Sequence, residues 1–268
     1  MGYQPERRAL LDVAVRAARA AADVIRAAAP RARTIDWRSK GPTDFVSEVD
    51  VAAEERILGL LARELPGITV LAEESAAATP PERVASGLAA VIDPLDGTTN
   101  FLHGYPEYAV SIALLVDGEP AAAVVLDVPG DECFTATAGG GAFLNGDAIR
   151  VSTIGDPRRA LIGTGFPFKD PADIAPYQAQ MSRVMAEVSG VRRPGAASID
   201  LASVAAGRFD AFWENVLSPW DFAAGMLLVR EAGGVATDLG GAHLRALAPS
   251  SVLAGNPVMH DWMRHVLG

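Results

Sequence analysis

The chain has little cysteine, little positive charge and no long apolar run. Among its 268 residues Cys133 is the only cysteine, which excludes an intramolecular disulfide and a thiolate metal cluster. A single thiol is typical of a reducing compartment, and its strand-like setting predicts a buried small side chain rather than a nucleophile. No apolar run reaches the roughly 18–20 residues of a membrane span, and the N-terminus has no signal-peptide pattern. We therefore expect a cytoplasmic protein without a membrane partner.

Positive charge is also scarce. Lys and Arg total 23 against 33 Asp and Glu, which gives a formal net charge of −10. Nucleic-acid-binding proteins usually carry a basic field, so we expect no nucleic-acid partner. Taken alone, the negative net charge also argues against an anionic substrate. Half of the residues are hydrophobic, which predicts a folded chain with a large buried core.

The spacing of apolar residues predicts a mixture of helices and sheets. Helical periodicity covers residues 8–29 and, after Asp50 as N-cap, a second stretch to about residue 65. Apolar runs at 109–116 and 121–128 flank a Gly-containing turn and predict a hairpin.

Beyond about residue 152, short strand-like runs alternate with helical ones. We therefore expect an α+β half over residues 1–152, carrying most of the candidate metal ligands, and an α/β half over residues 153–268. Asp221 and the candidate substrate contacts fall in the second half.

Four short segments concentrate carboxylates at predicted turns: residues 44–50 (DFVSEVD), 73–75 (EES), 93–100 (DPLDGTTN) and 219–221 (PWD). In the third, Pro94 is expected to end a strand at 89–92, so that Asp93 and Asp96 converge on one side of a turn. Carboxylate and carbonyl oxygens are the donors that Mg²⁺ prefers, and the Leu95 carbonyl lies between the two aspartates. This segment predicts a site for a hard divalent cation.

The residues that follow add a second feature. Gly97 permits a left-handed backbone, and residues 98–100 are expected to open a helix. The free amides of a helix N-terminus attract phosphate. A metal pair and a phosphate cradle would therefore be neighbours.

Each segment alone also has an ordinary explanation. Residues 93–97 could form a surface turn that ends in an N-cap, and Glu73 with Glu74 could be a solvated pair. Asp50 and Asp221 could simply cap helices. These explanations weaken because all four segments occur in one chain at the ends of predicted strands or helices.

Together the segments resemble the inositol monophosphatase family, whose Mg²⁺-dependent, lithium-sensitive superfamily also contains fructose-1,6-bisphosphatases. The matching stretches are residues 73–75, 92–101 (IDPLDGTTNF), 141–146 (GAFLNG), 163–167 (GTGFP), 220–225 (WDFAAG) and 231–234 (EAGG). Ser47, Ala72 and Val91 replace the usual Thr, Gly and Trp. The resemblance runs from about Lys40 to Pro257, and it implies an α+β fold, the layered α/β/α/β/α sandwich of the sugar-phosphatase type.

The resemblance also implies metal and catalytic residues. Two metals would share Asp93, and the implied ligands are Glu73, Asp93, the Leu95 carbonyl, Asp96, Thr98 and Asp221. Asp44 and Thr98 would orient and deprotonate the attacking water, and Glu73 would help to hold a weaker third metal. The metals would be Mg²⁺, two or three per site, or Mn²⁺ in its place, and Li⁺ would inhibit.

Substrate contacts are implied in the same way, at Asp96, Gly97, Thr98, Arg192, Gly195, Ala196, Glu214 and Asp221. The amides of Gly97 and Thr98 would bind phosphate oxygens, and Glu214 would accept hydrogen bonds from hydroxyls. For Glu214 an exposed position at a strand end stays an equal alternative, and Arg193 could take the part of Arg192.

The implied activity is hydrolysis of a small phosphorylated polyol, most simply myo-inositol 1-phosphate, by direct attack of water without a phosphoenzyme. Thr99 stands where members specific for histidinol phosphate or phosphonucleotides often have Lys. Those substrates, fructose 1,6-bisphosphate and a regulatory binding module without turnover stay open as alternatives. The resemblance also implies a homodimer. Two or three Mg²⁺ would bring about +4 to +6 charges to the acidic pocket, so the net charge does not exclude a phosphate ester.

Overall fold

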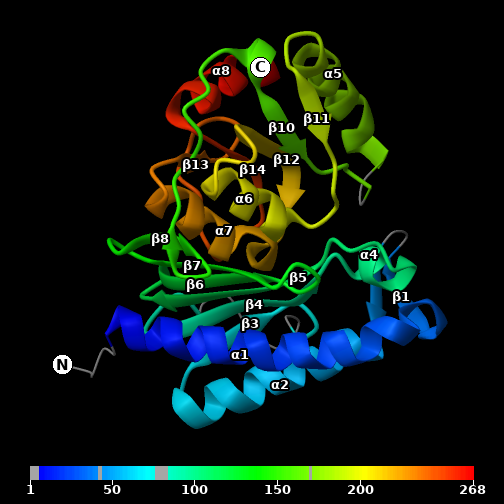
Figure 1. The fold of residues 1–268 in the computed structure, drawn as a ribbon, viewed down its shortest axis with the longest axis vertical. Coiled ribbons are helices and arrows are strands. Elements are labelled where there is room, and N and C mark those ends of the chain that lie inside the picture. Colours follow the sequence, from blue (N-terminus) through cyan, green and yellow to red (C-terminus); the bar gives the residue numbers. More distant parts are fainter. Residues whose placement is uncertain (1–5, 42–43, 76–83, 169–170) are drawn as a thin grey trace.

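The computed structural model describes residues 6–41, 44–75, 84–168 and 171–268. Helices and sheets alternate in layers through this part of the chain (Figure 1). From one side to the other, the order is α1 with α2, a seven-stranded sheet, α6 with α7, a five-stranded sheet, and α5 with α8. The expected layered α/β/α/β/α sandwich is therefore confirmed. The helices of these layers are α1 (Arg7–Ala28), α2 (Glu48–Glu64), α5 (Ile174–Met185), α6 (Ala197–Ala205), α7 (Pro219–Glu231) and α8 (Pro257–Leu267).

The larger sheet has the order β3-β4-β5-β6-β7-β8-β9, with one parallel pair, β3 and β4, and antiparallel neighbours elsewhere. The predicted hairpin is present as β5 and β6. Strands β8 and β9 were not predicted from the sequence. The strands are β3 (Thr69–Ala72), β4 (Leu88–Asp96), β5 (Ala109–Val116), β6 (Glu119–Asp127), β7 (Glu132–Thr137), β8 (Gly141–Leu144) and β9 (Asp147–Ala148).

The smaller sheet has the order β11-β10-β12-β14-β13. Parallel pairs join β10 to β11 and β12, whereas β14 runs antiparallel to β12 and β13. Its strands are β10 (Leu161–Thr164), β11 (Gly190–Arg192), β12 (Ala211–Leu217), β13 (Val235–Thr237) and β14 (Ser250–Gly255). A separate hairpin, β1 (Trp37–Gly41) and β2 (Asp44–Ser47), precedes α2.

The hydrophobic core follows the layers. One cluster joins α1 and α2 to the larger sheet, and another joins that sheet to α6 and α7 and on to the smaller sheet. A third lies between the smaller sheet and α5 with α8. Because the middle helices pack against both sheets, the division into halves near residue 152 stays a proposal.

Strand β4 differs from the sequence expectation. It does not end before Pro94 but continues to Asp96, and its register with β5 shifts between Asp93 and Asp96. Asp93 is paired with Ser111 and Asp96 with Ala109, so the segment carries a bulge. A bulge accommodates proline because the extra residue leaves the ladder, and the prediction that Pro94 ends the strand was therefore wrong.

The start of α2 also differs. Ser47, not Asp50, is the N-cap, and its hydroxyl accepts a hydrogen bond from the Val49 amide at 3.1 Å. Asp50 lies one turn later, where its Oδ2 accepts from the Ser47 amide at 2.8 Å and completes a capping box. Oδ2 of Asp50 therefore takes part in the capping box, and Oδ1 is left for a contact outside the helix.

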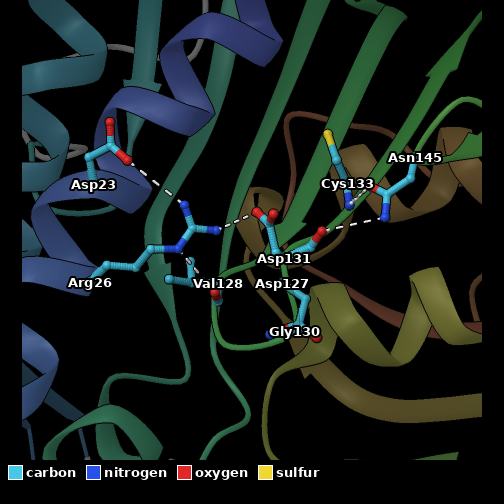
Figure 2. A network of polar contacts seen from close by, with 8 residues as sticks. All are labelled: Asp23, Arg26, Asp127, Val128, Gly130, Asp131, Cys133 and Asn145. Carbon is cyan, nitrogen blue, oxygen red and sulfur yellow. Dashed lines mark hydrogen bonds and ion pairs between the residues drawn. The ribbon is translucent and has the colours of Figure 1, made fainter.

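Polar contacts fasten α1 to the turn between β6 and β7 (Figure 2). Arg26 donates to Asp131 at 2.6 Å and to the Val128 carbonyl at 3.3 Å. Next to this turn the Cys133 amide donates to Asn145 at 2.9 Å. The Cys133 thiol is buried, as expected, and burial raises its pKa. A buried thiol with a raised pKa is a poor nucleophile, in agreement with a structural role.

Among the described residues, no helix is both long enough and apolar enough to span a membrane.

Close packing of α6 on α7 generates a stability prediction. A Cβ added to Gly225 in α7 would lie 2.5 Å from the Cβ of Leu201 in α6. We expect Gly225→Ala to lower the free energy of unfolding by about 1–3 kcal/mol because the two helices must separate. Gly59 is the matched control, since it is exposed in α2 and a Cβ there meets nothing within 4 Å.

The control change Gly59→Ala should raise the free energy of unfolding by about 0.5–1 kcal/mol through helix propensity. Urea titrations followed by circular dichroism measure both. A Gly225→Ala protein as stable as the unaltered chain would contradict the packing.

Candidate functional site

The bulge in β4 builds the centre of the site. It places Asp93 and Asp96 together at the C-terminal end of β4, and Asp93 is only 2% exposed. Oδ1 of Asp93 accepts a hydrogen bond from the Leu95 amide at 3.0 Å, which fixes the turn of the bulge. Glu73 comes from the end of the parallel neighbour β3, where its amide donates to the Ile92 carbonyl at 3.1 Å. Three carboxylates from adjacent strands therefore meet at one corner of the sheet.

Asp221 joins them from the other side. It lies in the first turn of α7, where its Oδ2 accepts from the Ser218 amide at 2.7 Å. Burial, and then the charges of Glu73, Asp96 and Asp221, raise the pKa of Asp93 well above its ordinary value. A hydrogen bond with Glu73 acts in the same direction. The structure thus brings together four predicted site carboxylates that repel one another.

Asp96 is held from the second half of the chain. Its Oδ2 accepts from the amide of Ser198 at 2.8 Å and from the Ser198 hydroxyl at 2.5 Å. Ser198 belongs to α6, so this contact fixes β4 against the middle helix layer. Ser198 was not among the predicted site residues, because no local pattern indicates a contact over a separation of 102 residues.

Thr98 has a partner that sequence analysis did not assign. Its hydroxyl donates to Oδ1 of Asp50 at 2.8 Å and lies 3.1 Å from the Leu95 carbonyl. Asp50 is 1% exposed, and burial raises its pKa even though Ser47 and Thr98 donate to it. In the sequence, only the capping-box spacing of Ser47 and Asp50 could have indicated that Asp50 lies inside the helix with its side chain held in place.

Asp44 was the residue expected to act with Thr98. Its backbone belongs to β2, but its side chain lies outside the part of the chain that the structure describes. The acidic partner that the structure gives to Thr98 is Asp50.

The predicted left-handed glycine and helix are both present. Gly97 has φ 91°, and a Cβ there would lie 2.7 Å from the Glu107 carbonyl oxygen. It is the N-cap of α4 (Thr98–His103), a short helix whose first amides have no partner within the helix. Asn100 donates to the Glu107 carbonyl at 2.8 Å and to the Pro194 carbonyl at 3.0 Å, which ties α4 to the loop before α6.

Two adjoining cavities open onto this cluster. A cavity of about 370 Å³ is lined by Glu73, Asp93, Leu95, Asp96, Gly97, Thr98 and Asp221, together with neighbouring residues. A second, of about 340 Å³, is lined among others by Gly195, Ala196 and Glu214. The cavities share Asp96, Asp221 and Gly195 in their walls, so they form one continuous site.

The two neighbouring arginines differ in position. Both are exposed, and the Arg192 guanidinium donates to the Val191 carbonyl at 3.1 Å. Arg193 lines both cavities, and its guanidinium carbon lies 5.1 Å and 5.2 Å from the ring centroids of Phe166 and Phe168. The geometry therefore favours Arg193 over the predicted Arg192 as the arginine of the site.

The donor set fits a hard cation. It consists of carboxylates and the carbonyl of Leu95, which are ligands for Mg²⁺ or Mn²⁺ rather than for softer metals. Within the described residues no group of three acidic, histidine or cysteine side chains is already arranged to hold a metal ion. The oxygens are instead engaged by local donors such as Leu95, Ser198 and Ser218 amides.

Comparisons with known proteins agree with this fold and site. The model of the inositol monophosphatase family matches residues 6–267. A Nus factor SuhB of Pseudomonas aeruginosa is 46% identical over 249 residues, which cover 92% of this chain and 91% of that protein. An inositol-1-monophosphatase of Rhizobium meliloti is 42% identical over 264 residues, 97% of each chain.

Among solved structures, the extragenic suppressor protein suhB of Bartonella henselae superposes with a TM-score of 0.88 at 39% identity, covering 97% of this chain and 98% of that one. The chain belongs to the inositol monophosphatase family. The resemblance carried by the motifs is confirmed, and with it the layered fold and the assignment to a family of phosphoric monoester hydrolases.

Proposed function

We propose that this protein hydrolyses a phosphate monoester of a small polyol, myo-inositol 1-phosphate first among them, with the help of divalent cations. The observation that supports this most is the meeting of Glu73, Asp93, Asp96 and Asp221 in the wall of one cavity, where Asp96 and Asp221 also line the second. The relative from Rhizobium meliloti, which aligns over 97% of both chains, carries the name of such an enzyme. One cavity would hold the phosphate with its cations, and the other the polyol.

We assign the cations to the carboxylate cluster. Mg²⁺, or Mn²⁺ in its place, would be held by Glu73, Asp93, the Leu95 carbonyl, Asp96 and Asp221. When bound, such ions lower the pKa of water and neutralise phosphate charge. The repulsion that raises the pKa of Asp93 would then become attraction to the cation. Lithium inhibition and a homodimer follow from the resemblance alone and stay predictions.

Thr98 and Asp50 would supply the proton path. The Thr98 hydroxyl already donates to Asp50, so its oxygen has lone pairs left to accept a proton from a water molecule. As that water attacks phosphorus and the ester P–O bond breaks, its proton would pass to Thr98 while the Thr98 proton passes to Asp50. The polyol would leave with its oxygen as an alkoxide, which takes a proton from solvent water. Asp50 therefore takes the part that the resemblance gave to Asp44. The amides of Gly97 and Thr98 would hold phosphate oxygens beside the attacking water.

The leaving group would lie in the second cavity, near Gly195, Ala196 and Glu214. The Glu214 carboxylate packs directly over Gly165, where no Cβ could fit. The missing side chain gives Glu214 access to the cavity, where it would accept hydrogen bonds from the hydroxyls of the polyol. Arg193, packed beside the rings of Phe166 and Phe168, would face both the phosphate and the leaving group.

A regulatory binding module remains the second candidate. It is favoured by the name Nus factor SuhB of relatives that are 44–46% identical to this chain. Retained carboxylates at the cavity wall favour turnover, and the next experiment separates the two.

Removal of the shared carboxylate tests the proposed function. We expect the unaltered protein to release inorganic phosphate from myo-inositol 1-phosphate in the presence of Mg²⁺ but not of excess EDTA. Asp93→Asn should lower kcat by about 10³-fold or more, because several kcal/mol of transition-state charge stabilisation would be lost. Asp131→Asn, an exposed aspartate outside the site, is the control and should leave kcat unchanged.

Phosphate release that is undiminished in Asp93→Asn would refute the cation proposal. Absence of release by the unaltered protein from a panel of sugar, polyol, histidinol and nucleotide phosphates would favour the binding module.

Asp50 can be tested as the proton acceptor. Asp50→Asn should lower kcat by about 10²–10⁴-fold with little change in KM, which is the range for loss of a general base. Ser47→Ala is the matched control, because it removes one donor to Asp50 but leaves the contact with Thr98. Its main effect should be a stability loss of about 1 kcal/mol at the N-cap.

The pH dependence follows from the same residue. The proton acceptor must be ionised, and burial raises the pKa of Asp50. Activity should therefore fall as pH is lowered through a pKa above the ordinary aspartate range. A kcat of Asp50→Asn equal to that of Ser47→Ala would contradict the assignment.

A further inference from the structure

The cavity assigned to the leaving group contains a buried carboxyl that the mechanism does not use. Asp200 lies in α6, lines this cavity together with Glu214, and is 1% exposed. It follows Ser198, the residue that holds Asp96, by two positions. The helix that fixes the cation cluster therefore also presents a carboxyl to the neighbouring cavity.

Asp200 differs from the other buried acids in its hydrogen bonding. Asp50, Asp93 and Asp210 each accept at least one hydrogen bond from a backbone amide. Glu54, also buried, accepts one from the Glu74 amide at 3.0 Å. Among the described residues, Oδ1 of Asp200 has no hydrogen-bond partner. A buried acceptor without a donor lowers the stability of the fold, and a ligand that enters the cavity can supply the donor.

The charge around Asp200 restricts what that donor can be. Burial raises the pKa of Asp200 well above its ordinary value, and the charges of Glu214, Asp96 and Glu107 act in the same direction. Arg193 opposes them. A second phosphate beside these acids would add repulsion, whereas a neutral hydroxyl can donate to a carboxylate and can also accept from a protonated acid. A neutral, hydroxyl-rich group therefore suits this cavity.

We propose that Asp200 is a specificity-determining residue that, beside Glu214, binds a hydroxyl of the leaving group and so selects monophosphates of neutral polyols. The inference rests on the proposed function and makes it narrower. We therefore expect kcat/KM to be higher for polyol monophosphates than for two other kinds of ester. These are phosphate esters without further hydroxyls and esters with a second phosphate.

The test compares two substrates in three proteins. The substrates are myo-inositol 1-phosphate and phenyl phosphate, which has the ester but no other hydroxyl, both with Mg²⁺. For inositol phosphate, Asp200→Ala should lower kcat/KM by about 10- to 100-fold, mainly through KM, and Asp200→Asn, which keeps one acceptor oxygen, should lose less. For phenyl phosphate both variants should stay within about twofold of the unaltered protein, because no hydroxyl is lost.

Asp210→Asn is the matched control for a purely structural effect. Asp210 is also buried in the second half, but it accepts from the Ser152 hydroxyl at 2.5 Å and the Leu161 amide at 2.7 Å and does not line either cavity. Any loss in this variant should be equal for the two substrates. An equal loss for both substrates in Asp200→Ala, or no loss for inositol phosphate, would overturn the inference.

A second measurement needs no variant. In a crystal of the unaltered protein with myo-inositol, inorganic phosphate and Mg²⁺, an inositol oxygen should lie within hydrogen-bond distance of the Asp200 carboxyl. An inositol bound in the cavity but away from Asp200 would overturn the inference and leave the proposed function intact. If the unaltered protein hydrolyses neither ester, the proposed function fails and this inference fails with it.

Discussion

Electrostatic repulsion around Asp93 is the constraint on which the rest of the structure depends. The carboxyl is 2% exposed and faces the charges of Glu73, Asp96 and Asp221. A folded protein tolerates such a group only if the surrounding backbone holds it in place and if a proton or a cation neutralises it. The bulge at Pro94 supplies the first condition, and we propose that a divalent cation supplies the second.

The means of holding the cluster are spread over both halves of the chain. Glu73 is placed by the parallel pairing of β3 with β4, and Asp221 by the cap of α7. Asp96 is held by two donors of Ser198 in α6. The site is thus complete only when the middle helices pack between the two sheets. The helices and strands that form the hydrophobic core are therefore also the ones that carry the residues of the cavities.

Much of the site could be predicted from sequence because its chemistry is local. Residues 93–101 place two carboxylates, a left-handed glycine and a helix start within nine positions, and Gly97 and α4 were found as expected. The position of Pro94 within a bulge of β4 could not be predicted in this way. Whether a proline ends a strand or sits in a bulge depends on the pairing partner, here β5.

Other features of the site depend on the fold in the same way. Asp50 reads as a helix cap from its neighbours, and only the fold shows that its second oxygen meets Thr98 across 48 residues. Arg192 and Arg193 are equivalent in the sequence, and the direction of the loop before α6 decides which one faces the cavities. Asp200 belongs to no motif, and its isolation from donors is visible only once α6 is packed.

Thermal unfolding with and without Mg²⁺ tests the central claim most directly. If the carboxylate cluster is a cation site, Mg²⁺ at about a hundred times its dissociation constant should raise the Tm of the unaltered protein by about 5–10 °C. Asp93→Asn removes one of the repelling charges, so its Tm without Mg²⁺ should be equal or higher and should no longer respond to the ion. A Tm that Mg²⁺ does not change in the unaltered protein, or changes equally in Asp93→Asn, would contradict the account.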